Sequence, residues 1–160
     1  MASIIVENCF FTIEINSTFG LEKLMSKQNV NKLDVRVYYE DTDAGGVVYY
    51  ANYLKFFERG RSEWVRGIGV SQSDLLDQNI AFVVRRVEMD NLAPARFEQI
   101  ITVQTSLTEL KRASMVFTQT ITYNNTTLVS ALVKVACVDL TTMRPRAIPA
   151  ELSKELISGT

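Results

Sequence analysis

The sequence predicts an α+β domain in which one long central helix is wrapped by a curved antiparallel sheet of about five strands. One segment has apolar residues at helical spacing: Tyr53, Phe57, Trp64 and Ile68. The segments after it are rich in Val, Ile, Thr and Phe, and turn-forming residues separate them. A single helix cannot provide the crossovers of a doubly wound parallel sheet, so we expect the strands to pair antiparallel around it.

The predicted elements begin with a strand and a turn. Residues 36–39 alternate in polarity as a strand does, and turn formers follow at Asp41, Asp43, Gly45 and Gly46. The helix then contains Gly60, although glycine in a helix costs about 1 kcal/mol relative to alanine. We expect a close approach of the helix to the sheet at this glycine; the alternative is that it is merely tolerated.

Four further strands are predicted after the helix. They are Ala81–Met89, Gln99–Leu110, Ser114–Tyr123 and Thr127–Leu140. Turn signals separate them at residues 91–94, 111–112 and 124–125.

The chain of 160 residues, 47% of them hydrophobic, suffices for one core, and no linker composition divides it. We expect a single domain over residues 31–160, preceded by an N-terminal extension over residues 1–30. A translation start at Met25 would leave residues 1–24 as an artefact or an arm, and a real extension is the equal alternative.

Net charge, hydropathy and cysteine content exclude several classes of partner and site. A net charge of −1 with mixed signs argues against nucleic acid and anionic membranes as partners. No apolar run is long enough for stable membrane insertion and the N-terminus lacks a secretory signal, so the expected location is cytoplasmic. Cys9 and Cys137 cannot form a zinc site without His or further Cys, so no metal is expected; Cys137 is interpreted as a buried core thiol.

The acidic turn has chemical meaning because it precedes a helix N-terminus. Such a terminus offers unpaired N–H groups and a partial positive charge, which can bind a carbonyl oxygen on which negative charge develops. A carboxylate and an oxyanion site are therefore expected in one turn.

Six motifs along the chain extend this interpretation. They are Tyr-Tyr-Glu-Asp-Thr-Asp-Ala-Gly-Gly-Val-Val-Tyr at 38–49, Phe-Phe-Glu-Arg at 56–59, Ala-Phe-Val-Val-Arg at 81–85, Ala-Pro-Ala-Arg at 93–96, Val-Phe-Thr-Gln at 116–119 and Arg-Pro-Arg-Ala-Ile-Pro at 144–149. Together they resemble the hotdog-fold acyl-CoA thioesterases of the 4-hydroxybenzoyl-CoA thioesterase family, most closely its tol-pal-associated members in Gram-negative bacteria. The resemblance covers roughly residues 33 to 155.

The resemblance implies that Asp43 is the catalytic carboxylate, as general base or as nucleophile. A helix cap is the alternative role for this residue. It also implies that the backbone amide of Tyr50 binds the thioester oxygen. Most tol-pal-associated members carry His where Tyr50 stands, and this chain has no His at all, so chemistry based on His is excluded.

Glu58 is the second choice as catalytic carboxylate, because its neighbours Phe56 and Phe57 suggest burial, but an ion pair with an arginine is the favoured role.

The residues expected to bind the acyl group are Gly45, Gly46, Val47, Val48 and Tyr53, with core packing an equal alternative for Tyr53. The residues expected to bind the CoA nucleotide are Lys111, Arg112 and Ser114, with solvation of the two cations as the alternative.

We expect hydrolysis of a short-chain or aromatic acyl-CoA to the free acid and CoA. Coenzyme A is part of the substrate, so no separate cofactor is expected. The resemblance implies a homo-oligomer, a dimer of dimers with sites at subunit interfaces, and allows an acyl carrier protein as a partner. The alternatives are a non-catalytic acyl-binding or scaffold protein in envelope or phospholipid assembly, and a hotdog hydratase or dehydratase, which usually relies on a catalytic His.

Overall fold

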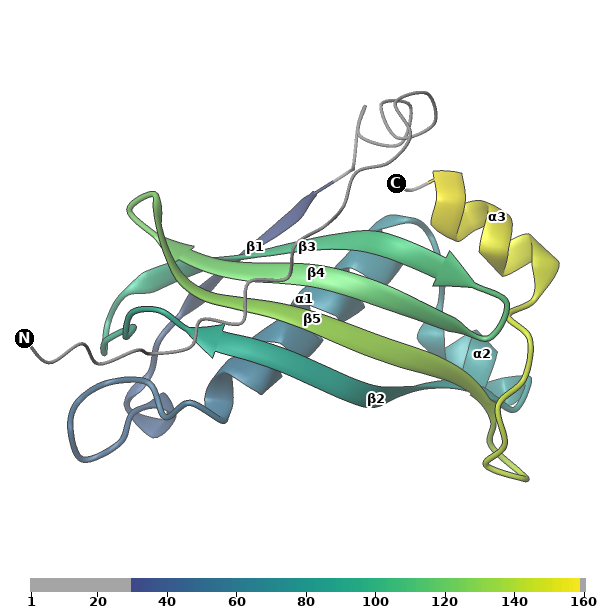
Figure 1. Cartoon of the computed structure of the whole chain (residues 1–160), viewed down its shortest axis with the longest axis horizontal. Helices are drawn as coiled ribbons and strands as arrows, with labels where there is room; N and C mark the ends of the chain where they lie inside the picture. Colours follow the sequence, from purple (N-terminus) through teal and green to yellow (C-terminus); the bar gives the residue numbers. More distant parts are fainter. Residues whose placement is uncertain (1–29, 159–160) are drawn as a thin grey trace, which may run out of the picture.

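A computed structural model describes residues 30–158 of the chain. Its centre is one five-stranded antiparallel sheet in the order β1-β3-β4-β5-β2, which curves over helix α1 (Figure 1). The elements are β1 Asn31–Arg36, a 3-10 helix Tyr39–Asp41, α1 Asn52–Gly67, α2 Gln72–Asp77, β2 Ile80–Asn91, β3 Ile100–Lys111, β4 Ser114–Tyr123, β5 Thr126–Asp139 and α3 Ala150–Ser158. The expected fold class, a hotdog arrangement, is confirmed; the expected extension over residues 1–30 lies almost entirely outside the described residues.

Tight turns set the register of the central strands. The β4–β5 turn places Asn124 and Asn125 at φ 47° and φ 62°, a left-handed conformation that asparagine tolerates and that matches the twist of a hairpin. This turn pairs Tyr123 with Thr126, and the ladder then continues to Ser114 opposite Ala136. The four strands after α1 lie within two residues of their predicted bounds at each end.

Helix α1 buries one face against the sheet. Phe56 and Phe57 are fully buried, and the Trp64 ring meets the Phe117 ring edge to face at 5.4 Å between centroids. Burial of each such side chain stabilises the fold by about 1.5–3 kcal/mol. The helical periodicity in the sequence therefore identified the face that packs on the sheet.

Gly60 lies where α1 packs closely against β3. A Cβ atom at this position would stand 2.7 Å from Thr105 Oγ1 and 2.9 Å from Val103 Cγ1, both on β3. Glycine allows this approach, whereas a larger residue would force the Thr105 or Val103 side chain to shift. The expected close approach is confirmed.

The first strand was predicted too late in the chain. β1 ends at Arg36, although the N–H of Val37 still donates to the carbonyl of Gln99 at 2.9 Å. The Asp41 carboxylate, which is buried, accepts the N–H of Tyr38 at 2.9 Å and turns the chain into the 3-10 helix. This side-chain bond competes with the strand, so the alternation at residues 36–39 was misleading.

Helices α2 and α3 were not predicted. Ser71 caps α2 by accepting the N–H of Asp74 at 3.3 Å, and α3 starts directly after Pro149. α3 buries Leu152 and Leu156.

Cys137 is fully buried in the core, as expected, and burial raises the pKa of its thiol.

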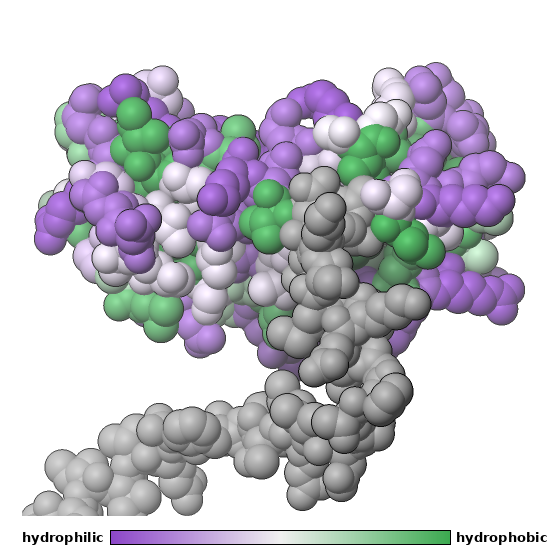
Figure 2. All heavy atoms as spheres, turned by 90° about the horizontal axis from the view of Figure 1, so that it is seen from above, coloured by the Kyte–Doolittle hydropathy of each residue, from purple (hydrophilic) through white to green (hydrophobic). Residues whose placement is uncertain are grey.

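The surface is chemically mixed. On the face shown in Figure 2, hydrophilic residues predominate and apolar ones are scattered in small groups, in keeping with the near-zero net charge. Among the described residues, none of the helices is long and apolar enough to cross a bilayer.

Candidate active site

Asp43 lies in an exposed hairpin turn between the 3-10 helix and α1. Its carboxylate Oδ1 accepts the N–H of Gly45 at 2.8 Å, and its carbonyl accepts the N–H of Gly46 at 3.0 Å. Gly46 has φ +72°, and a Cβ on Gly45 would stand 3.1 Å from Asp43 Oδ1, so both glycines suit the turn. Within the described residues, Asp43 Oδ2 has no hydrogen-bond partner, which leaves it free for water or substrate.

The turn is fixed to the connection between β2 and β3. The N–H of Val48 donates to the carbonyl of Ala95 at 2.9 Å, and Val47 forms an isolated bridge with Arg96. The N–H of Ala95 in turn donates to the hydroxyl of Tyr53 at 3.0 Å. The ring of Tyr53 is almost fully buried, and burial raises its pKa, so core packing is part of its role.

The start of α1 is fixed by Asp41 and Asn52, which the sequence did not single out. The carbonyl of Asp41 accepts both the N–H of Tyr49 at 2.9 Å and Asn52 Nδ2 at 3.0 Å. The N–H groups of Tyr50 and Ala51 have no acceptor within residues 30–158. These two amides are the unpaired donors expected at a helix N-terminus.

The N-cap position of α1 is Ala51, and no side chain caps this helix. The alternative in which Asp43 serves as the helix cap is therefore wrong. The Asp43 carboxylate instead closes its own turn through Gly45, as short Asx turns do.

A hollow of about 420 Å³ opens beside the helix start. Three of the predicted site residues line it, namely Val48, Tyr50 and Tyr53, together with residues 91–94 at the end of β2. The Tyr50 side chain is 59% exposed there, and its ring lies 4.8 Å from that of Tyr49. The structure thus brings the predicted amide donor and part of the predicted acyl-binding set together.

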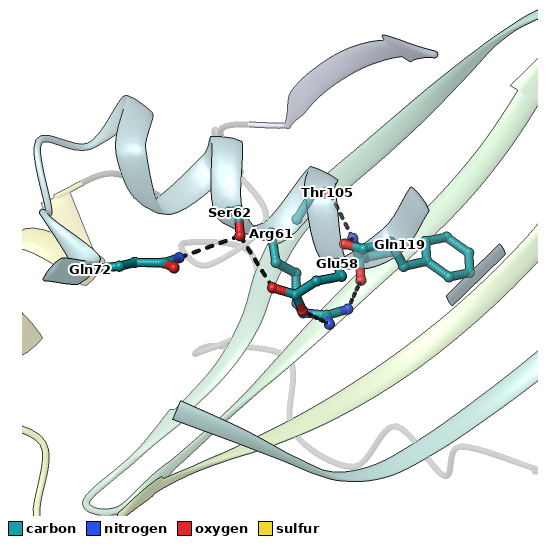
Figure 3. Close-up of polar contacts among 7 residues, drawn as sticks. Glu58, Arg61, Ser62, Gln72, Thr105 and Gln119 are labelled. Carbon is teal, nitrogen blue, oxygen red and sulfur yellow. Dashed lines mark hydrogen bonds and ion pairs between the residues drawn. The ribbon is translucent and has the colours of Figure 1, made fainter. Parts of the chain in front are cut away.

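A buried polar network lies further along α1 (Figure 3). Gln119, fully buried on β4, donates through Nε2 to the carbonyl of Phe57 at 2.9 Å and to Thr105 Oγ1 at 2.8 Å. Its Oε1 accepts from Arg61 at 2.8 Å. Burial lowers the pKa of the Arg61 guanidinium, and the neighbouring Glu58 opposes that shift.

Glu58 forms an ion pair with Arg61 and accepts from Ser62 Oγ at 3.2 Å. The ion pair with an arginine is the role favoured from sequence, and it is confirmed. The burial assumed for a catalytic Glu58 is absent, because its side chain is 58% exposed.

Lys111, Arg112 and Ser114 lie at the β3–β4 turn, at the opposite end of the sheet from Asp43 (Figure 1). β3 alone is about 36 Å long at 3.3 Å per residue. Lys111 is paired with Glu109 at 2.7 Å, and the carbonyl of Arg112 accepts the N–H of Ile148 at 2.8 Å. Within one chain, the expected nucleotide-binding residues do not approach the expected catalytic turn.

A partly open hollow of about 160 Å³ lies between α1, α2 and the sheet. Apolar side chains from α1, α2, β2, β4 and β5 line its interior, and Glu58, Arg61, Ser62 and Gln72 line its polar side. The sequence did not indicate this hollow, because its residues come from five separate elements. Within residues 30–158, no group of three or more His, Cys, Asp or Glu side chains is placed to hold a metal ion.

Known proteins resemble this chain over most of its length. Residues 37–156 match the family model described as the thioesterase-like superfamily. The acyl-CoA thioester hydrolase YbgC of Escherichia coli O6:H1 is 48% identical over 122 residues, which cover 76% of this chain and 91% of that protein. The acyl-CoA thioesterase YbgC of Haemophilus influenzae is 49% identical over 119 residues, covering 74% and 88%.

A similar solved structure is a probable thioesterase from Bartonella henselae. It superposes with a TM-score of 0.71 at 37% identity, covering 75% of this chain and 99% of that one.

Proposed function

The chain belongs to the thioesterase-like superfamily and is an acyl-CoA thioester hydrolase, and from that premise we propose that Asp43 and the α1 N-terminus hydrolyse the thioester of a short-chain or aromatic acyl-CoA. One observation carries this proposal. The unpaired N–H groups of Tyr50 and Ala51 follow, within the same connection, a turn whose exposed carboxylate keeps one oxygen free.

The proposed chemistry needs no histidine. The thioester oxygen accepts the Tyr50 N–H, so the negative charge that develops there meets a preorganised donor. Asp43 removes a proton from water as hydroxide adds to the carbonyl carbon, or it attacks that carbon itself and forms an anhydride that water then cleaves. The C–S bond breaks and CoA leaves as a thiolate, which is stable enough to depart without a strong acid, since thiols ionise near pH 8.5.

The proposed assembly is a homo-oligomer, a dimer of dimers, that extends the sheet through β2. β2 is an edge strand of twelve residues. It exposes Val84 at 48% and Val87 at 36%, and a long exposed edge is a template for pairing with another chain. Lys111, Arg112 and Ser114 would then bind the nucleotide of a substrate held by another subunit. A cytoplasmic location and use of acyl carrier protein as acyl donor belong to the same proposal.

The test is Asp43→Asn beside Glu58→Gln. Loss of a general base or nucleophile should lower kcat by about 10²-fold or more in Asp43→Asn. Fold and oligomer should persist, because Asp43 is exposed. Glu58→Gln should lose less activity, or lose stability instead. Near-wild-type turnover in Asp43→Asn would refute the assignment, and the reverse ranking would move the role to Glu58.

Wild-type protein that hydrolyses no member of a panel of short-chain, long-chain and aromatic acyl-CoAs would favour the acyl-binding or scaffold alternative.

A further inference from the structure

Asn52 is the first residue of α1, and its side chain reaches back to the segment that leads into Asp43. We propose that Asn52 is a positioning residue for thioester hydrolysis. By holding the carbonyl of Asp41, its side-chain amide fixes the Tyr50 N–H relative to the Asp43 carboxylate. This inference rests on the proposed function, because it assumes that Tyr50 and Asp43 act on one thioester.

The hydrogen bond between Asn52 and Asp41 closes a loop of the chain that contains both proposed catalytic groups. The carbonyl of Asp41 accepts Asn52 Nδ2 at 3.0 Å and the N–H of Tyr49 at 2.9 Å. Asp43 lies two residues after this carbonyl, and Tyr50 lies two residues before the side chain that holds it. The contact therefore limits how far the Tyr50 N–H can move from the Asp43 carboxylate.

Hydrogen bonds inside the loop keep Asp43 in place relative to the Asp41 carbonyl. The N–H of Asp43 donates to the carbonyl of Val47 at 2.9 Å, and Thr42 forms an isolated bridge with Val48. The loop is thus a small closed hairpin, and a displacement of its fixed end displaces the carboxylate as well.

The hydrogen bond of Asn52 is shielded from water. Asn52 is 8% exposed and Asp41 is 6% exposed, so water competes little for this carbonyl. The side chain is not a helix cap, because a cap accepts a free N–H at the helix start, whereas Asn52 donates to a carbonyl outside α1. The N-cap position belongs to Ala51. The polar side chain of Asn52 therefore serves the link to Asp41.

Within residues 30–158, no other side chain in the first turn of α1 makes this link. The N–H of Tyr53 donates to the carbonyl of Tyr50 at 3.3 Å, inside the same turn. The Tyr53 hydroxyl accepts the N–H of Ala95 at 3.0 Å and so fixes the helix to the connection between β2 and β3. Asn52 is the side chain of this turn that reaches the segment before Asp43.

The test is Asn52→Leu, which keeps the approximate size of the side chain and removes the donor. The Asp41 carbonyl keeps the N–H of Tyr49, so the substitution leaves no acceptor unpaired there. Because a misplacement of about 1 Å can lower a rate by about 10²-fold, kcat should fall about tenfold or more. KM should change by less than about threefold, since an oxyanion donor acts mainly in the transition state.

Thr105→Val is the matched control for loss of a buried hydrogen bond. Thr105 is fully buried and accepts from Gln119 Nε2 at 2.8 Å. It lies beside Gly60, which is about 15 Å along α1 from Tyr50. Thr105→Val should lower the midpoint of urea unfolding and keep the wild-type kcat. Asn52→Ala replaces Asn52→Leu if that variant does not fold. A fall in kcat of less than about tenfold in a folded Asn52 variant, or an equal fall in Thr105→Val, overturns the inference.

A double-mutant cycle identifies the group through which Asn52 acts. Once Tyr50→Pro has removed the amide, Asn52→Leu has nothing left to misplace, so it should lower kcat by less than about twofold further. A further fall as large as in the wild-type background would show that Asn52 acts by another route, and overturns the inference. Full activity of Asp43→Asn would instead refute the proposed function, and the cycle would still report whether Asn52 positions the Tyr50 amide.

Discussion

The backbone and the side chain of Tyr50 have separable roles. The N–H has no acceptor within the described part of the chain, whereas the ring is 59% exposed and contacts Tyr49. The neighbouring Tyr50 side chain raises the pKa of Tyr49. Any residue except proline supplies an N–H at this position.

Substitutions at residue 50 should therefore separate reaction from selectivity. Tyr50→Phe and Tyr50→His should retain turnover and change acyl preference, because both keep the amide. Tyr50→Pro removes the donor, and loss of one oxyanion donor typically lowers kcat by about 10²–10³-fold. Steady-state kinetics on several acyl-CoAs check this, with circular dichroism as the control for folding. A Tyr50→Phe enzyme as inactive as Asp43→Asn would show that the phenol itself is catalytic.

Single residues were predictable from sequence where their chemistry is local. The Asp43 turn, its glycines and the helix start lie within about ten residues, so turn and helix rules place them together. Arg61 and Gln119 are 58 residues apart, and only the packing of α1 on β4 joins them. An ion pair of Glu58 with an arginine was expected, and the partner, Arg61, lies one helical turn away. The exposure of Glu58 could not be inferred from its aromatic neighbours.

Elements were predictable where one periodicity dominates. α1 and the four later strands follow clear patterns of apolar residues. The first strand was predicted too late in the chain because the Asp41 carboxylate accepts the N–H of Tyr38 and redirects the backbone there. The alternation of polar and apolar residues does not reveal such a local hydrogen bond. α2 has only six residues and buries none fully, so its pattern was too short to recognise.

The packing of α1 on β3 predicts opposite outcomes at two helix glycines. Gly60→Ala should destabilise the protein by about 1–3 kcal/mol, because its Cβ overlaps Thr105 and Val103 and this overpacking exceeds the gain in helix propensity. Gly67→Ala, whose Cβ would meet nothing nearer than Asn31 Nδ2 at 3.9 Å, should be neutral or stabilising by up to about 1 kcal/mol.

Urea unfolding of both glycine variants measures the difference. Equal stability of the two would show that α1 can shift on the sheet without loss of free energy.

At the scale of the whole molecule, the expected site is spread along the sheet. Asp43 and Tyr50 lie at one end, and the β3–β4 turn with Lys111 lies at the other. The sequence could not reveal this separation of the site residues, because it indicates which strands form but not which strand ends lie together in the sheet. An assembly of several chains is the simplest way to make these parts serve one substrate.

That assembly should depend on the edge of β2. Val87→Lys places a charge where two β2 strands would pair, and edge lysines oppose such pairing. The oligomer should dissociate in sedimentation velocity, and activity should fall with it, because the proposed site needs two chains. Activity should return as protein concentration rises, since mass action favours the oligomer. Leu132→Lys, also at an exposed apolar site but on the neighbouring strand β5 rather than on the edge strand itself, should not dissociate the β2-paired dimer or lose its activity. A monomeric Val87→Lys protein with full activity would show that one chain contains the whole site.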